Sequence, residues 1–489
     1  MRNSILFFAA ISSILMACEK PSLNKNYIAE ARAVWMGGGD VNDWDSTMAA
    51  LSKAGFNLVI PNMLSSGSAY YPSKYVPMIS ERDELALCLE AAHKHGIEVH
   101  VWKVNWALWQ VNEDSLEKYE KENRIQISYD QKSVPQVSKE LGWNQKYDWL
   151  CPSHPDNREM EKNLMMEVVR NYDIDGIHFD YMRYPYEPLC YCKTCQEKFA
   201  QETGLPLENW PGDVWKGGKY REVYLDWRRE NITSSAREIA AAVHKYDPYV
   251  CVSLAARSGL EYAYYSDAQV WWEWIDEGIL DFVCPMNYSD KPSGYLQSIR
   301  EHFPLVKGNI PYYGGIGLFR MRDSHLLEEA IEGGHKLGQD GFTIFSYKWG
   351  GLRERLDTVS AYLENKQFTL LPHRGPEVRY YFRNSKNASE EGFPLYERNE
   401  DVNAEVVIMM KAKLKQGISR IYGDIRIQDM ERKVIKEIKH IDIRQSEKLN
   451  LSFSPGTTGR FHLALAGYME LSDGQYKPFI SKSFPFEIR

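Results

Sequence analysis

Eight short apolar runs, each followed by a segment with helical periodicity, occupy residues 30–365 of this chain. Such alternation of strand-like and helix-like segments is typical of βα units around a parallel sheet. Eight units predict an α/β fold, a (β/α)8 TIM barrel with enlarged loops, over residues 28–371. The predicted strands cover residues 32–36, 57–63, 98–105, 176–180, 249–255, 281–287, 310–314 and 341–346, and the clearest helices cover residues 83–95, 157–172, 224–245 and 326–337.

A doubly wound open sheet is the alternative arrangement, and it normally carries a glycine-rich phosphate turn after its first strand. The run Gly37-Gly38-Gly39 lacks both the GxGxxG spacing and a correctly placed helix start, so we favour the barrel. Two long excursions, 107–152 and 181–218, follow the third and fourth predicted strands. Since they leave from the C-terminal face, where barrel enzymes carry their active sites, we expect them to form walls of a substrate site.

The character of the sequence changes after residues 372–376, Pro-His-Arg-Gly-Pro, which are typical of a linker. Period-two alternation follows, with turn residues between the runs. We predict an immunoglobulin-like β-sandwich over residues 377–489. It contains no catalytic grouping, and it either binds glycan or packs on the barrel. Its predicted strands cover residues 379–383, 404–410, 420–428, 434–443, 449–453, 460–471 and 479–488.

The N-terminus has the features of an export signal. A short positive start precedes an apolar stretch at residues 5–16, which is too short to span a bilayer and predicts a signal peptide over residues 1–17. Residues 15–18, Leu-Met-Ala-Cys, resemble the lipobox of bacterial lipoproteins. This resemblance implies that Cys18 is acylated and that residues 18–27 tether the protein to the cell envelope, at the outer membrane on its periplasmic or surface side. A soluble secreted protein with an incidental cysteine is the alternative.

Length and charge restrict the remaining possibilities. A chain of 489 residues is too long for one ordinary core, which agrees with two domains. The formal net charge is −8, and no basic tract is present. We therefore expect no nucleic-acid partner, and contact with a membrane only through the N-terminal lipid.

The motif at residues 173–185, Asp-Ile-Asp-Gly-Ile-His-Phe-Asp-Tyr-Met-Arg-Tyr-Pro, contains a glycine-led strand that ends in a carboxylate. Period two places Gly176, His178 and Asp180 on one face of the strand, pointing into the barrel, with Asp180 nearest its mouth. A carboxylate there is costly unless it is paired, and His178 or Arg183 is close enough in sequence to keep it ionised. We interpret Asp180 as catalytic. A structural aspartate that caps the loop is the alternative.

Residues 172–185 resemble the signature of the glycosyl-hydrolase-like proteins related to family ten, a group found among bacterial envelope lipoproteins. The resemblance implies a barrel, an envelope location and hydrolysis of glycosidic bonds in a polysaccharide or peptidoglycan-type glycan. Asp180 also lies where several barrel glycosidases, α-amylase-like ones included, carry their nucleophile. Further segments that carry the resemblance, in the order of the predicted strands, lie at residues 33–35, 54–57, 71–75, 95–102, 151–155, 227–229 and 285–288.

Glycoside hydrolysis normally requires a second carboxyl group, and its separation from the first decides between retention and inversion. Asp290, three residues beyond the sixth predicted strand, is the first candidate, followed by Glu261, Asp267 and Asp40. Family-ten enzymes proper place glutamates on strands four and seven, and this chain has neither, so their mechanism is not carried over. The rival hypothesis is a non-catalytic glycan-binding lipoprotein on the same barrel scaffold.

Amide, guanidinium and aromatic side chains cluster at or just beyond the predicted strand ends, as a sugar site requires. We predict that the glycan contacts some of them: Trp35, Asn62, Trp102, Asn105, His178, Arg183, Tyr184, Arg257, Asn287, Tyr288 and Tyr347.

Three cysteines, Cys190, Cys192 and Cys195, fall in the long loop after the fourth predicted strand. They are candidates for a structural zinc site, for which Cys151 or His154 would be the fourth ligand. In an oxidising compartment, a disulfide with a free thiol is the alternative. We expect no cofactor for the reaction itself, since catalytic zinc would need several histidines at the strand ends.

Overall fold

The computed structural model describes residues 27–489, except 307, 365–368, 386, 390, 391, 411–416, 431 and 455. Its central feature is an eight-stranded parallel sheet in the order β7-β6-β5-β4-β3-β2-β9-β8. A further parallel bridge, between Val283 and Tyr312, brings the two end strands together. The sheet is therefore a nearly closed barrel, as the sequence predicts. Its strands are β2 Ala31–Gly37, β3 Leu58–Ser65, β4 Glu98–Val104, β5 Gly176–Asp180, β6 Cys251–Ala256, β7 Phe282–Pro285, β8 Tyr313–Gly317 and β9 Gly341–Phe345.

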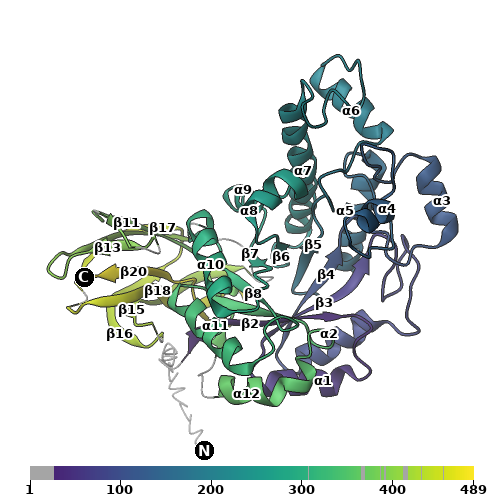
Figure 1. Cartoon of the computed structure of the whole chain (residues 1–489). Helices are drawn as coiled ribbons and strands as arrows, with labels where there is room; N and C mark the ends of the chain where they lie inside the picture. The colour runs from purple at the N-terminus through teal and green to yellow at the C-terminus, as the bar shows by residue number, and fades with distance from the viewer. Residues whose placement is uncertain are drawn as a thin grey trace, which may run out of the picture.

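Helices surround the barrel, and the four that the sequence predicts most clearly are confirmed as α2, α5, α7 and α11. The two long excursions carry α3 and α4 after β4, and α6 after β5. These helices lie on the side of the barrel away from the C-terminal sheets (Figure 1). The bounds are α1 Trp44–Lys53, α2 Glu84–Lys94, α3 Glu113–Lys121, α4 Val134–Glu140, α5 Pro155–Asn171, α6 Lys193–Thr203, α7 Arg221–Tyr246, α8 Leu260–Tyr262, α9 Trp271–Asp276, α10 Pro292–Val306, α11 Ser324–Lys336 and α12 Leu356–Glu364.

Helix α2 shows how the local sequence sets these elements. The Asp83 side chain accepts a hydrogen bond from the Ala86 backbone N–H at 2.9 Å and so caps the first turn. Leu85, Cys88 and Ala92, spaced three and four residues apart, form a buried stripe toward the sheet. His93 and Lys94 in the last turn complement the negative end of the helix dipole.

The two faces of β5 are divided as period two predicts. Ile177 and Phe179 belong to the apolar cluster that joins the sheet to the surrounding helices. Gly176 and His178 face the barrel interior, where a Cβ at Gly176 would lie 2.3 Å from Nδ1 of His100. Only glycine fits at this layer, because the imidazole already fills the space that a side chain would take. Asp180 therefore reaches the carboxyl end of the barrel.

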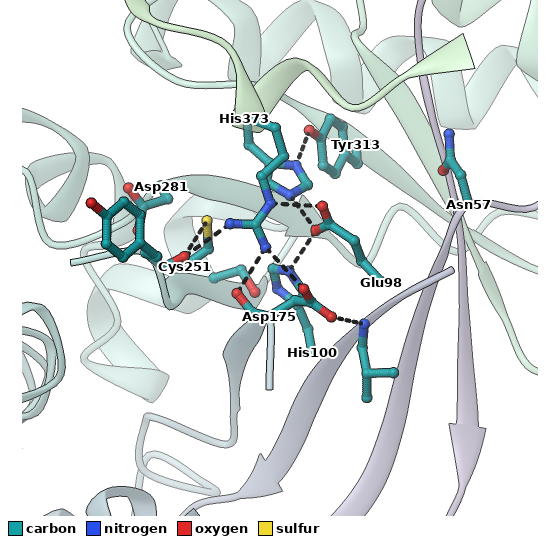
Figure 2. Close-up of polar contacts among 12 residues, drawn as sticks. Asn57, Glu98, His100, Asp175, Cys251, Asp281, Tyr313 and His373 are labelled. Carbon is teal, nitrogen blue, oxygen red and sulfur yellow. Dashed lines mark hydrogen bonds and ion pairs between the residues drawn. The ribbon is translucent and has the colours of Figure 1, made fainter. Parts of the chain in front are cut away.

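The linker between the domains is built into the opposite, N-terminal face of the barrel. His373 is buried there, and its ring bonds the Tyr313 hydroxyl at 2.8 Å and the Glu98 carboxylate at 3.1 Å (Figure 2). Nε of Arg374 bonds Glu98 at 2.7 Å, and its two terminal nitrogens bond the backbone oxygens of Tyr249 and Asp175. The predicted linker thus also closes the base of the barrel.

The C-terminal domain contains two sheets that share one apolar cluster. The smaller has the order β11-β14-β17, and the larger has the order β12-β13-β20-β18-β15-β16 with β19 paired to β18. All seven predicted strands are present, the last divided into β19 and β20; an immunoglobulin-like topology stays a prediction. The strands are β11 Glu377–Arg383, β12 Asn387–Ala388, β13 Pro394–Tyr396, β14 Val402–Met409, β15 Ile418–Gln428, β16 Val434–Ile443, β17 Glu447–Phe453, β18 Gly459–Leu471, β19 Tyr476–Ile480 and β20 Phe484–Ile488.

The predicted signal peptide, Cys18 and all but the last residue of the predicted tether lie outside the described residues. Residues 28–29 form the short strand β1 (Ile28–Ala29), which pairs in parallel with β10 (Thr369–Leu370). Across the part of the chain that the structure describes, we find no helix with both the length and the apolar character that a membrane span needs.

Candidate active site at the carboxyl ends of the strands

Asp180 is the last residue of β5, and only 5% of its surface is exposed. The Tyr181 backbone N–H donates to its Oδ1 at 2.7 Å, and Nη1 of Arg183 lies 3.3 Å from the same oxygen. Tyr181 has φ of 54°, in the left-handed region, so the chain turns sharply and brings Arg183 back to the carboxylate. Burial raises the pKa of Asp180 even though Arg183 and Arg257 oppose this effect.

Asp180 is the first of four side chains that alternate in charge. Beyond Arg183 lies Asp267, whose Oδ2 is 3.5 Å from Nε of Arg183 and 2.6 Å from Nε of Arg257. Asp267 is fully buried, and its backbone oxygen accepts a hydrogen bond from the Tyr184 N–H at 2.8 Å. Asp267, one of the predicted candidates for the second carboxylate, thus orients two guanidinium groups toward Asp180.

Three tyrosines are close enough to Asp180 for its charge to affect their pKa: Tyr147 from the excursion after β4, Tyr181, and Tyr288 after β7. Burial and the negative charge of Asp180 both raise the pKa of each phenol, so all three remain protonated and able to donate hydrogen bonds. Trp149 stacks on Tyr181, with ring centroids 4.9 Å apart and planes inclined by 13°. Tyr147, Tyr181 and Trp149 are not among the site residues predicted from the sequence. The only available signal was the aromatic run just before Cys151.

Aromatic rings from the ends of β7, β8 and β9 form a second wall. Trp349 is 67% exposed, and its ring centroid lies 4.9 Å from that of Phe319 and 5.4 Å from that of Phe345. Tyr288 contacts Phe319 and Phe345 at 5.4 and 5.5 Å. An exposed indole supported by partly buried rings offers a flat apolar face of the kind that stacks on sugar rings. Of these four aromatic residues, only Tyr288 is predicted from the sequence.

Several predicted sugar contacts instead bond to other parts of the protein. Trp35 Nε1 donates to His178 Nε2 at 3.0 Å, and His178 Nδ1 donates to the Ser253 hydroxyl at 2.9 Å, since that hydroxyl donates to the Ile177 carbonyl. Burial lowers the pKa of His178 well below its usual range, which keeps the imidazole neutral. His178 therefore braces the barrel interior rather than holding Asp180 ionised.

Two predicted asparagines are held in the same way. Nδ2 of Asn105 donates to the buried carboxylate of Glu161 at 2.7 Å, while its backbone N–H donates to the Asp180 carbonyl at 2.8 Å. Asn287 accepts a hydrogen bond from the Ser258 hydroxyl and donates one to the Tyr312 hydroxyl, both at 2.8 Å. These residues position the strand ends.

The other predicted contacts fall into two groups. Nδ2 of Asn62 and Nε1 of Trp102 are buried and have no hydrogen-bond partner among the described residues, so both remain available to a bound glycan. Tyr184 and Tyr347 are buried: Tyr184 packs under the guanidinium of Arg228, and Tyr347 bonds to the backbone of Trp35 through its N–H.

The predicted second carboxylate lies on the surface. The Asp290 side chain is 70% exposed, and its Oδ1 lies 3.4 Å from Nη1 of Arg320. Asp40 accepts a hydrogen bond from the Gly37 N–H at 2.9 Å, and Glu261 is an exposed residue of α8.

The three predicted cysteine ligands come together with Cys151, and all four are buried. His154, the other predicted fourth ligand, caps α5 by accepting a hydrogen bond from the Asp156 N–H.

Comparison with known proteins identifies the family to which this chain is similar. Residues 30–301 match the model of the family described as glycosyl hydrolase-like 10. Glycosyl hydrolase YngK of Bacillus subtilis is 24% identical over 302 residues, which cover 53% of this chain and 54% of that protein. Glycosyl hydrolase DigH of Escherichia coli K12 is 23% identical over 274 residues, covering 49% and 56%. The chain thus spans about half the length of the curated relatives it matches.

Solved structures agree on the fold. The glycoside hydrolase domain of PgaB (BpsB) from Bordetella bronchiseptica superposes with a TM-score of 0.54 at 12% sequence identity. The alignment covers 68% of this chain and 98% of that domain. At this level of identity, the likeness shows a shared barrel architecture and leaves the chemistry to be argued from the site.

Proposed function

Since the chain belongs to the glycosyl hydrolase-like 10 family, we propose that it cleaves glycosidic bonds of a polysaccharide or peptidoglycan-type glycan, with Asp180 as the central carboxylate. One observation supports this most strongly: Asp180 is a buried carboxylate at the carboxyl end of a barrel strand, bonded by the Tyr181 N–H and by Arg183. The carboxyl ends of the strands carry catalysis in barrel enzymes.

The electrostatics favour Asp180 as the general acid. A glycosidase acid must keep its proton until the leaving oxygen takes it, which requires a raised pKa, and burial raises the pKa of Asp180. The Arg183 guanidinium then stabilises the carboxylate that remains after proton transfer. We assign Asp290 as the partner that acts as base or nucleophile. It lies two residues beyond Tyr288, and Tyr288 is close enough to Asp180 for the charge of that carboxylate to raise the pKa of the phenol. No cofactor enters these steps.

The test is hydrolysis of a glycan panel that includes purified peptidoglycan, with products identified by mass spectrometry. We expect Asp180→Asn to lower kcat/KM by about 10²–10⁴-fold, as for loss of a general acid. Asp173→Asn, in the same motif but before β5 and exposed, is the matched control and should retain activity. Unchanged product release by Asp180→Asn would overturn the assignment. Unchanged release by Asp290→Asn would remove Asp290 alone.

A non-catalytic glycan-binding protein is the second candidate, and the exposure of Asp290 favours it. A carboxylate that is 70% exposed and paired with Arg320 does not face Asp180 as a preorganised partner would. In this case the wild-type protein would retain the glycan in a pull-down or in calorimetry but release no product from any member of the panel. Trp349 and the donors of Asn62 and Trp102 would then be the binding surface.

We further propose that the protein acts as a lipoprotein of the cell envelope, anchored through Cys18 after removal of residues 1–17. The proposal rests on the lipobox-like residues 15–18 and on the apolar stretch before them. Mass spectrometry of the mature N-terminus should find a lipid-modified Cys18, and Cys18→Ala should release the protein from the membrane fraction. An unmodified Cys18 in membrane-free protein would contradict it.

A further inference from the structure

Four cysteines from two separate loops meet behind the candidate site. Cys151 ends the excursion after β4, just before α5, while Cys190 and Cys192 lie in the loop after β5 and Cys195 is in the first turn of α6. All four are buried, and their sulfur atoms lie within 4.8 Å of one another. None is in a disulfide. The proposed reaction uses none of them.

The spacing of the sulfur atoms matches a tetrahedral metal site. The Cys151–Cys195, Cys151–Cys192 and Cys192–Cys195 sulfur pairs are 3.5, 3.6 and 3.7 Å apart. A disulfide would require about 2.05 Å. With zinc–sulfur bonds of about 2.3 Å, the edge of a regular tetrahedron is about 3.8 Å. The cluster is therefore too open for disulfides and has nearly the size that a tetrathiolate site requires.

The surroundings suit a cluster of negative charge. Arg228 is fully buried, and its bonded partners are the backbone carbonyls of Leu189 and Ser266, while its Nε and Nη1 have no hydrogen-bond partner in the described part of the chain. Its guanidinium lies 4.3 Å from the centre of the Tyr184 ring. A buried cation without a bonded anion is costly, whereas a zinc ion with four thiolates carries a double negative charge that would offset it.

Hydrogen-bond donors also approach the sulfur atoms. The Ser153 hydroxyl lies 3.0 Å from the sulfur of Cys151 and 3.3 Å from that of Cys195. Cys192 is the N-cap of α6, so the positive end of that helix dipole points at the cluster. Donors in the shell around metal ligands hold thiolates in place and are typical of genuine metal sites.

We propose that Cys151, Cys190, Cys192 and Cys195 bind one structural Zn²⁺ ion. Four protein ligands leave no open coordination position, so the ion does not activate water and takes no part in glycan hydrolysis. Its effect is mechanical: it joins the excursion that carries Tyr147 and Trp149 to the loop that begins at Asp180. The proposal is independent of the proposed function, since a glycan-binding protein would need the same brace.

A second group of possible metal ligands, Glu98, His100 and His373, lies at the base of the barrel. Here the cationic Arg374 already bonds Glu98 at 2.7 Å and occupies the role that a metal would have. In the described part of the chain, no cationic side chain is shown bonded to a sulfur atom of the cysteine cluster, and the neighbouring Arg228 bonds backbone carbonyls instead. The contrast supports assigning metal to the cysteines alone.

The test is metal analysis of the full-length protein, purified without added metal or chelator. We expect about one zinc ion per chain by plasma mass spectrometry. Replacement by Co²⁺ should give the intense visible absorption of a tetrahedral thiolate complex. Cys192→Ser should lose the stoichiometric zinc, while Cys88→Ser, a buried cysteine on α2 outside the cluster, should keep it.

Three results would overturn the proposal. Wild-type protein without stoichiometric metal would do so, as would disulfide-linked peptides between the cluster cysteines under non-reducing digestion. Stoichiometric iron in place of zinc would overturn the metal assignment, since iron also accepts a tetrahedral sulfur site. Metal content of the wild-type chain decides the question even if Cys192→Ser fails to fold. Glycan hydrolysis is not part of this readout, so its absence leaves the zinc result unaffected.

Discussion

The buried carboxyl group of Asp148, the residue before Trp149, allows a quantitative test of how burial near the candidate site affects stability. Burial raises the pKa of its carboxyl from 3.8 to about 6, and its Oδ1 is buried without a hydrogen-bond partner among the described residues. In the unfolded chain the same carboxyl titrates near its usual value of about 3.9. The folded state therefore binds more protons between about pH 4 and pH 6, so stability falls as pH rises through this window. A pKa difference of this size corresponds to about 3 kcal/mol lost by pH 7.

Replacing Asp148 with asparagine should remove this loss. We expect Asp148→Asn to match the wild type most closely near pH 4 and to exceed its free energy of unfolding by about 1–3 kcal/mol above pH 7. The lower end applies if the new amide N–H group is left without an acceptor. Urea unfolding followed by tryptophan fluorescence at several pH values measures the difference. Asp114→Asn, exposed on α3 of the same excursion, is the control and should show no such trend. A constant difference between variant and wild type across the pH range would refute the reasoning.

Three further substitutions test other parts of the structure. Lys103→Met leaves the fully buried Glu161 without its ion-pair partner, and urea unfolding should show a loss of about 3–5 kcal/mol that a second change, Glu161→Leu, largely restores. Arg374→Ala removes the guanidinium that bonds Glu98, whose side chain is still 21% exposed, and should cost about 1–3 kcal/mol in the same assay. Trp349→Ala should raise KM about three- to tenfold with little change in kcat, because the exposed ring binds substrate but touches no reacting bond. An unchanged free energy of unfolding for either charge variant, or a fall in kcat for Trp349→Ala, would contradict the corresponding argument.

The barrel could be predicted because each strand is an apolar run between helices, and only β8 was displaced. The sequence predicts residues 310–314, whereas the strand is Tyr313–Gly317. Glycine has a low strand propensity, so the prediction for a strand that contains three glycines is displaced toward the residues that precede it. The structure requires two of them: a Cβ at Gly314 would lie 2.2 Å from the Tyr295 hydroxyl, and one at Gly315 would lie 2.5 Å from the Pro285 carbonyl. Such close approach is a tertiary property that a single sequence does not show.

The site was predictable only where its residues are neighbours in the sequence. Asp180 and Arg183 lie within one motif, so a strand and a turn suffice to bring them together. Trp149 and Cys151 come from an excursion of more than forty residues, whose return path local patterns do not determine. For the cysteines, spacing left both Cys151 and His154 as candidates for the fourth ligand, and the structure places only Cys151 in the cluster.

The same distinction explains why the first carboxylate is better defined than the second. Asp180 ends a strand with neighbours on both sides, and the backbone alone fixes where its side chain can lie. Asp267 is held as firmly, because it is fully buried and both Arg183 and Arg257 contact its Oδ2. Asp290 has the opposite properties: its side chain is 70% exposed, and it forms an ion pair with Arg320. A catalytic pair that includes Asp290 must therefore form on glycan binding, since the ion pair with Arg320 is the contact that the structure shows for this carboxylate, and among the described residues no contact joins it to Asp180.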